Sequence, residues 1–208
     1  MSAYSPALEA AALDAVAAAF PAPPAWVQST FASVAAPPAI GWPRLGACRL
    51  GRVDWVVTVA AAAHDAALAG RRRAYGCRAA RLGGDAPLTA LAILRRDPAR
   101  RRPGHLVLGF AGPFWRPWAP LAAPSWAEFC GWRQPRTARV AWVFTLAGAA
   151  AGGTRLALTV AGDAACPVAK RAFLAYLTAV GPLSRWLRGR LLAAVAGALA
   201  AARAPPIS

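Results

Sequence analysis

Residues able to act as acids, bases or metal ligands are few in this chain. The two histidines, His64 and His105, belong to no H-E-x-x-H motif, and we interpret both as surface or strand-edge residues. The eight carboxylates include no pair spaced as an acid–base couple on one element. The sequence also lacks G-x-S-x-G, P-loop and G-x-G-x-x-G motifs. We therefore assign no catalytic residue and expect no metal and no cofactor.

Aromatic side chains are more prominent than polar ones. Nine tryptophans in 208 residues is a high number. The stretch "GFAGPFWRPW" at 109–118 places Phe114, Trp115 and Trp118 among residues that break regular structure. These rings either close one end of a core or line the mouth of a cavity. A largely apolar cavity with few polar groups is typical of a binding site for hydrophobic molecules.

The cysteines and the N-terminus predict a cytoplasmic protein. The four cysteines are Cys48, Cys77, Cys130 and Cys166, and their spacing fits neither a zinc site nor a C-x-x-C redox pair. Residues 1–20 carry Glu9 and Asp14 but no basic region, so they are a poor signal peptide. The uncharged stretch 15–43 is long enough to span a bilayer, but its prolines prevent one continuous helix. We predict no transmembrane segment.

The formal net charge is +16, and Lys170 is the only lysine among 24 basic residues. This composition is typical of a GC-rich coding sequence, yet positive charge also favours nucleic acid and anionic membrane surfaces. The arginine runs at 71–73, 95–96 and 100–102 fall in predicted loops or helix ends, mostly apart from the aromatic residues. Single-stranded nucleic-acid binders interleave the two. We therefore expect only non-specific nucleic-acid binding, which is lost as salt rises from about 50 to 200 mM.

The elements that must position the aromatic rings follow from hydrophobic periodicity. The N-terminal half predicts a helix at 3–20, a strand at 25–36, a short broken helix after Pro37, a strand at 53–59 and a helix at 60–68. The C-terminal half predicts a strand at 105–112, an irregular connection after it, a hairpin of strands 139–148 and 154–162, and a helix at 168–203. Gly181-Pro182 is expected to kink or break this last helix.

Three motifs follow one another in the C-terminal half. They are Gly-x-x-Gly-x-Phe-Trp at 109–115, Gly-Gly-Thr-x-Leu at 152–156 and Arg-x-Phe-x-x-Tyr at 171–176. Their order over residues 104–200 resembles bacterial SRPBCC proteins, the START-like polyketide-cyclase and lipid-transfer superfamily. The stretch 31–45 also resembles the family's first strand and the helix start that follows it. Relatives often carry Thr-Glu-Thr-Arg on the last strand, whereas residues 158–161 here are Leu-Thr-Val-Ala.

The resemblance implies an α+β helix-grip fold, in which a curved antiparallel sheet wraps a long C-terminal helix with a cavity between them. We divide the chain into an N-terminal helical arm at 1–24, a single START-like domain at 25–203 and a tail at 204–208. The candidate cavity residues are Phe110, Phe114, Trp115, Trp142, Phe144, Phe173, Tyr176, Leu177 and Val180.

Three functions stay open. We prefer non-enzymatic binding of a hydrophobic small molecule or lipid in that cavity. The second is a cyclase or aromatase-like enzyme of the same fold, which two or more polar side chains converging in the cavity would favour. The third is a basic protein that binds nucleic acid or an anionic membrane surface, which one contiguous arginine face without a cavity would favour. The sequence fixes neither the ligand nor the oligomeric state.

Overall fold

The computed structural model of the chain describes residues 6–49, 88, 92–96, 103–116, 119, 121–149 and 152–201. The strand and helix predicted at 53–68, His64, Trp118 and the arginine runs at 71–73 and 100–102 lie outside the described residues.

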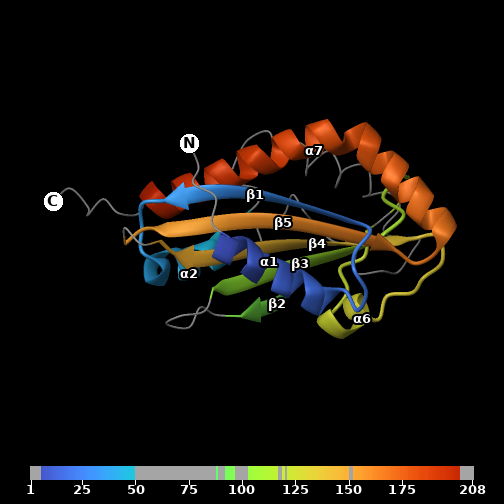
Figure 1. Cartoon of the computed structure of the whole chain (residues 1–208), viewed down its shortest axis with the longest axis horizontal. Coiled ribbons are helices and arrows are strands. Elements are labelled where there is room, and N and C mark those ends of the chain that lie inside the picture. Colours follow the sequence, from blue (N-terminus) through green and yellow to red (C-terminus); the bar gives the residue numbers. More distant parts are fainter. Residues whose placement is uncertain are drawn as a thin grey trace.

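Five antiparallel strands form one open sheet in the order β1-β5-β4-β3-β2 (Figure 1). The strands are β1 (Trp26–Val34), β2 (Ala92–Arg96), β3 (Gly104–Gly112), β4 (Ala138–Gly148) and β5 (Thr154–Ala164). The predicted hairpin is confirmed, because β4 and β5 pair along their whole length with Trp142 opposite Val160 and Phe144 opposite Leu158. The first strand therefore lies beside the last one, and the molecule is α+β with an antiparallel sheet.

The long helix α7 (Pro167–Ala201) packs across this sheet. It is a single helix that continues through Gly181 and Pro182, so the prediction of a break at this position is wrong. Its path over the sheet is arched (Figure 1). Pro182 donates no backbone N–H and is exposed on the outer side of the helix, where a proline produces curvature of this kind.

Helices cover both faces of the sheet. The face toward α7 and α2 (Pro38–Ala47) carries the even-numbered residues of β3, β4 and β5, such as Leu106, Phe144 and Leu158. The opposite face carries odd-numbered residues, such as Val107 and Val143, which pack against α1 (Pro6–Ala19) and the short α6 (Trp126–Cys130). This alternation is what the period of two predicts for a strand that is buried on both sides.

Two sequence interpretations are wrong around β2 and β3. Arg95 and Arg96, expected in a loop or helix end, belong to β2, where they pair with Leu106 and His105. His105, expected at a surface or strand edge, is buried, and its Nδ1 lies 3.2 Å from the Thr145 hydroxyl oxygen. Both errors have one cause: β3 is an interior strand because β2 covers its edge.

Gly109 of β3 allows two elements to approach closely. A Cβ atom at this position would stand 2.2 Å from Ile93 Cδ1 of β2 and 2.9 Å from Phe129 Cδ2 of α6. No side chain fits there, so this glycine permits close packing of β2 and α6 on β3.

Candidate functional site

The predicted cavity residues gather on the α7 face of the sheet. Phe110, Phe144 and Phe173 are buried in the hydrophobic cluster there. The residues Phe114, Trp115, Trp142, Tyr176 and Leu177 are partly buried and pack against the same cluster. Val180 is half-buried on α7. We call this set, together with Trp26 of β1, the aromatic layer.

The rings after β3 pack against the beginning of α7. Phe114 lies 6.0 Å from Phe173 between ring centroids, and the Phe173 ring in turn rests over Gly162 of β5. Phe110 and Trp142 meet edge to face at 5.8 Å, an arrangement that aromatic rings favour. Rings from the glycine- and proline-rich stretch therefore close this end of the layer.

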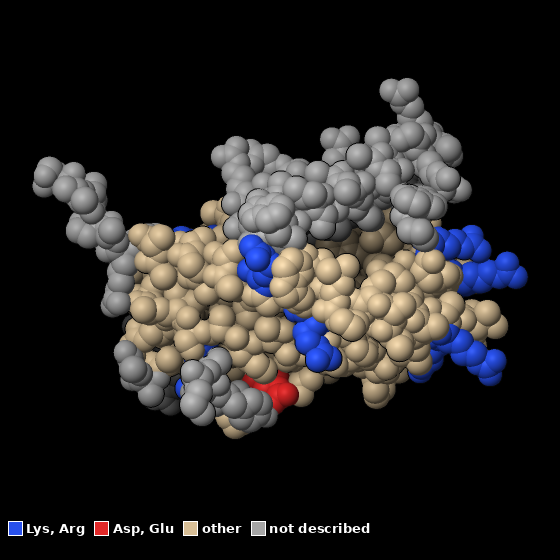
Figure 2. All heavy atoms as spheres, turned by 90° about the horizontal axis from the view of Figure 1, so that it is seen from above, with Lys and Arg blue, Asp and Glu red and all other residues tan. Residues whose placement is uncertain are grey.

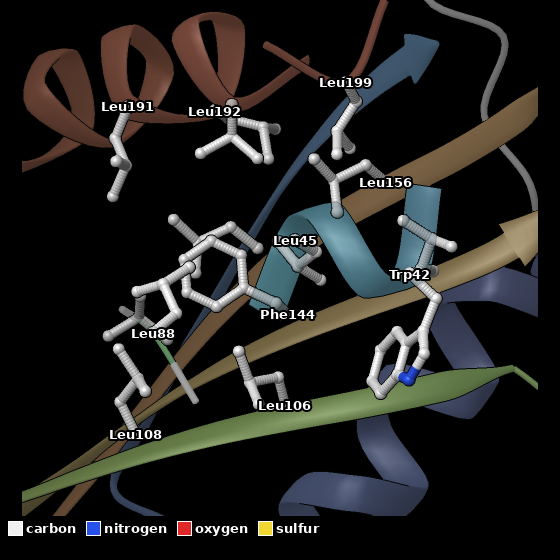
Figure 3. Packing of buried hydrophobic residues seen from close by; sticks show 14 of the residues in the cluster. Trp42, Leu45, Leu88, Leu106, Leu108, Phe144, Leu156, Leu191, Leu192 and Leu199 are labelled. Atoms are coloured by element: carbon white, nitrogen blue, oxygen red, sulfur yellow. The ribbon is translucent and has the colours of Figure 1, made fainter. Parts of the chain in front are cut away.

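The other end of the layer is filled mainly by leucine side chains. Leu191, Leu192 and Leu199 of α7 lie over Leu106, Phe144 and Leu156 of the sheet (Figure 3). Leu45 and Trp42 of α2 complete this end, and all of these side chains are buried. Here the space between helix and sheet is a packed core.

The middle of the layer differs from both ends. In the described stretch 174–187 of α7, no side chain is fully buried. Beneath it, Trp142 is only partly buried although its neighbours on the central strand β4 are buried. Trp26 and Gln28 of β1 are also partly buried on this face. The rings of Trp26 and Trp142 are thus partly exposed on the face of the sheet that α7 covers.

One charged side chain reaches into the middle of the layer. Arg188 of α7 is only 3% exposed. Its Nη2 donates a hydrogen bond to Gln28 Oε1, and its guanidinium lies 5.2 Å from the centre of the Trp26 ring. Among the described residues, its Nε and Nη1 atoms find no hydrogen-bond partner. Burial lowers the pKa of this guanidinium, and the nearby charge of Arg185 lowers it further.

Sequence reasoning missed Arg188 and Gln28, although a signal for both exists. Arg188 precedes Leu191 and Leu192 by three and four residues, so it belongs to the inward stripe of the helix. Gln28 follows Trp26 by two residues, so both side chains lie on the same face of β1. Both positions follow from periodicity, but a charged residue on an apolar stripe is ordinarily assigned to the helix edge.

Tyr176 is the phenol of the aromatic layer. Burial raises the pKa of its hydroxyl, which stays protonated at neutral pH. This hydroxyl forms no hydrogen bond with a described residue. It is therefore available as a donor or acceptor to a bound molecule.

A small polar pocket lies on the opposite face of the sheet. Its volume is about 130 Å³, and Arg139, Asp163 and Trp132 contribute to its lining. Arg139 Nη1 donates to the carbonyl oxygens of Phe129 and Cys130 at 2.7 and 2.8 Å, and the guanidinium lies 4.7 Å from the centre of the Phe20 ring. These hydrogen bonds hold the end of α6 against the sheet. The pocket itself is too small for a lipid.

No protein-family model, curated protein or solved structure matches the chain. Within the described residues, no group of three His, Cys, Asp or Glu side chains could hold a metal ion. The helices of the described part are also too short or too polar to cross a membrane.

Proposed function

We propose that this protein binds a hydrophobic small molecule or lipid in the aromatic layer, between the sheet and the middle of α7. The observation that carries the proposal is the partial exposure of Trp142 on the central strand, on the sheet face covered by a helix that has fully buried side chains before residue 174 and after residue 187 but none between them. Apolar area left partly open inside a fold gains free energy when a ligand covers it, at roughly 25 cal/mol per Å².

We also propose that the fold is the helix grip of the START-like superfamily. An antiparallel sheet with a long C-terminal helix across one face supports this assignment. The motif order in residues 104–200 supports it as well. The Gly-x-x-Gly-x-Phe-Trp element ends β3, and the Arg-x-Phe-x-x-Tyr element opens the inward face of α7.

A cyclase-like enzyme is the second candidate, because two polar side chains, Arg188 and Gln28, converge in the layer. Their chemistry favours binding over catalysis. A guanidinium keeps its proton at neutral pH and an amide does not titrate, so neither can act as a general base or a nucleophile. They can orient a ligand and hold a negative charge.

The basic surface gives less support to the third candidate. On the face seen in Figure 2, the Lys and Arg side chains of the described residues gather at one end and are otherwise separated by uncharged surface. A protein that follows a phosphate backbone needs a continuous basic track.

Fluorescence of N-phenylnaphthylamine, a neutral apolar probe, tests the proposed function. The parent protein is expected to bind the probe, and Trp142→Ala is expected to weaken binding about two- to tenfold, as the loss of an aromatic contact implies. The matched control is Trp186→Ala, because Trp186 is 50% exposed on the outer side of α7. Absence of probe binding by the parent, or equal losses in both variants, would contradict the proposal.

A further inference from the structure

Two arginines are buried in the part of the chain that the structure describes, and their surroundings contrast. Arg139 is 5% exposed and donates to two backbone carbonyls, and the carboxylate of Asp163 lies opposite it on β5. Burial and then the charge of Arg133 lower the pKa of its guanidinium, and Asp163 offsets part of this change. Arg188 is buried to a similar degree but has one hydrogen bond, to a neutral amide. No carboxylate among the described residues pairs with it.

Such an arrangement is unusual for a guanidinium. Arginine stays protonated in proteins, and a buried charge is ordinarily paired or fully hydrogen-bonded because its removal from water is costly. Contact with the Trp26 ring offsets part of this cost but supplies no negative charge. Arg188 therefore carries unused N–H donors and an unneutralised positive charge beneath α7, beside the partly open aromatic surface.

We propose that Arg188 binds the carboxylate of the ligand, so that the molecule accommodated in the aromatic layer is an apolar acid. This inference rests on the proposed function and narrows its ligand class. The apolar part of the acid would lie along Trp142 and the partly buried residues of α7, and its head group would meet the guanidinium beside Trp26.

A carboxylate fits this position better than a phosphate does. One guanidinium neutralises one negative charge, and its fork of N–H groups matches the two oxygens of a carboxylate. A phosphate monoester brings a charge of about −1.5 to −2 at neutral pH, which would leave buried negative charge without a partner. The Gln28 side-chain amide has N–H donors that bond to no described residue, and these can support the same head group.

A pair of ligands with the same chain tests the proposal: decanoate and decanol, each used to displace N-phenylnaphthylamine. The parent protein is expected to bind decanoate at least about tenfold more tightly than decanol, which is what a hydrogen bond to a charged group implies. Arg188→Met is expected to remove this preference while leaving decanol affinity within about twofold. Arg171→Met is the control, because it removes an exposed charge from the same helix and should keep the preference.

The outcomes separate the two proposals. If the neutral probe and both decyl compounds fail to bind the parent, the proposed function is wrong and this inference falls with it. If decanol and decanoate bind the parent equally, or if Arg188→Met keeps the preference, only the role of Arg188 is overturned. A purely structural role predicts that Arg188→Met weakens both compounds to the same degree. Should that variant fail to fold, Arg188→Gln serves in its place. The comparison of decanoate with decanol binding by the parent protein needs no variant.

Discussion

The Phe173 ring rests directly on Gly162, so that a Cβ atom at position 162 would stand 2.6 Å from Phe173 Cζ. One residue belongs to the first turns of α7 and the other to β5. This relationship fixes the height of the helix over the sheet where the aromatic layer begins. A glycine here is a packing requirement, because the ring occupies the volume of the missing side chain.

Gly162→Ala is therefore expected to lower the free energy of unfolding by about 1–3 kcal/mol, the usual cost of overpacking a core. Urea denaturation measures this loss. Gly189→Ala is the matched control, because a Cβ atom there meets nothing within 4 Å and the position lies inside a helix. That substitution should raise stability by roughly 0.5–1 kcal/mol. The same sign for both variants would argue against the packing described.

Phe173→Ala is expected to cost about 3–5 kcal/mol of unfolding free energy, because Phe173 is fully buried and packed by Phe114 and the sheet. Leu174→Ala, at the adjacent exposed position, should change stability by less than about 1 kcal/mol. Thermal or urea unfolding compares the two. A small effect of Phe173→Ala, with altered uptake of a neutral probe, would instead mark Phe173 as a wall of the binding space.

Arg188→Met and Arg139→Met are expected to differ in their effects on stability. Replacing Arg188 removes a buried charge that has no counter-charge among the described residues, so the ligand-free protein should be as stable as the parent or more stable. Replacing Arg139 removes two hydrogen bonds, to the carbonyl oxygens of Phe129 and Cys130 at the end of α6, which costs about 1–3 kcal/mol. Denaturation of both variants without ligand is the measurement, and a clear loss in Arg188→Met would indicate a structural role.

Cys166 is expected to react with iodoacetamide at lower pH than Cys48. Backbone N–H groups of Ala169 and then Arg136 lower the pKa of the Cys166 thiol, whereas burial raises that of Cys48. A lowered pKa increases the thiolate fraction at any pH below the ordinary thiol value, and the thiolate is the reactive form. Alkylation followed by peptide mass spectrometry between about pH 6 and 10 should place the midpoint of Cys166 below that of Cys48. Coincident midpoints would contradict this.

Local patterns predicted the elements that carry the strongest periodicity. The β4–β5 hairpin and α7 follow from a change of period. The alternation in the second strand of the hairpin puts Leu156, Leu158 and Val160 on one face, and the structure shows that this is the face toward α7. The clustering of aromatic residues after Gly109 also indicated where side chains would gather. These features depend on residues close in sequence, which is why sequence alone contains them.

The remaining features depend on partners distant in sequence. Arg95 and Arg96 form a strand because β3 offers a free edge, and nothing in their own composition signals it. The burial of His105 follows from the same pairing. Arg188 was missed because burial of a charge is decided by the side chains opposite it, here Trp26 and Gln28 of β1.

The arch of α7 has a mechanical consequence. Its two ends are held by Phe173 and by the leucines at 191, 192 and 199, while the span between them is secured by few buried side chains. A helix that is packed firmly near both ends deforms most easily in the span between them. Pro182 lies in this span and lacks the backbone N–H of a helical hydrogen bond. If the protein binds apolar acids as proposed, substitutions in this span are expected to change the length of the acid that fits, because the packing at the two ends of the helix is unchanged.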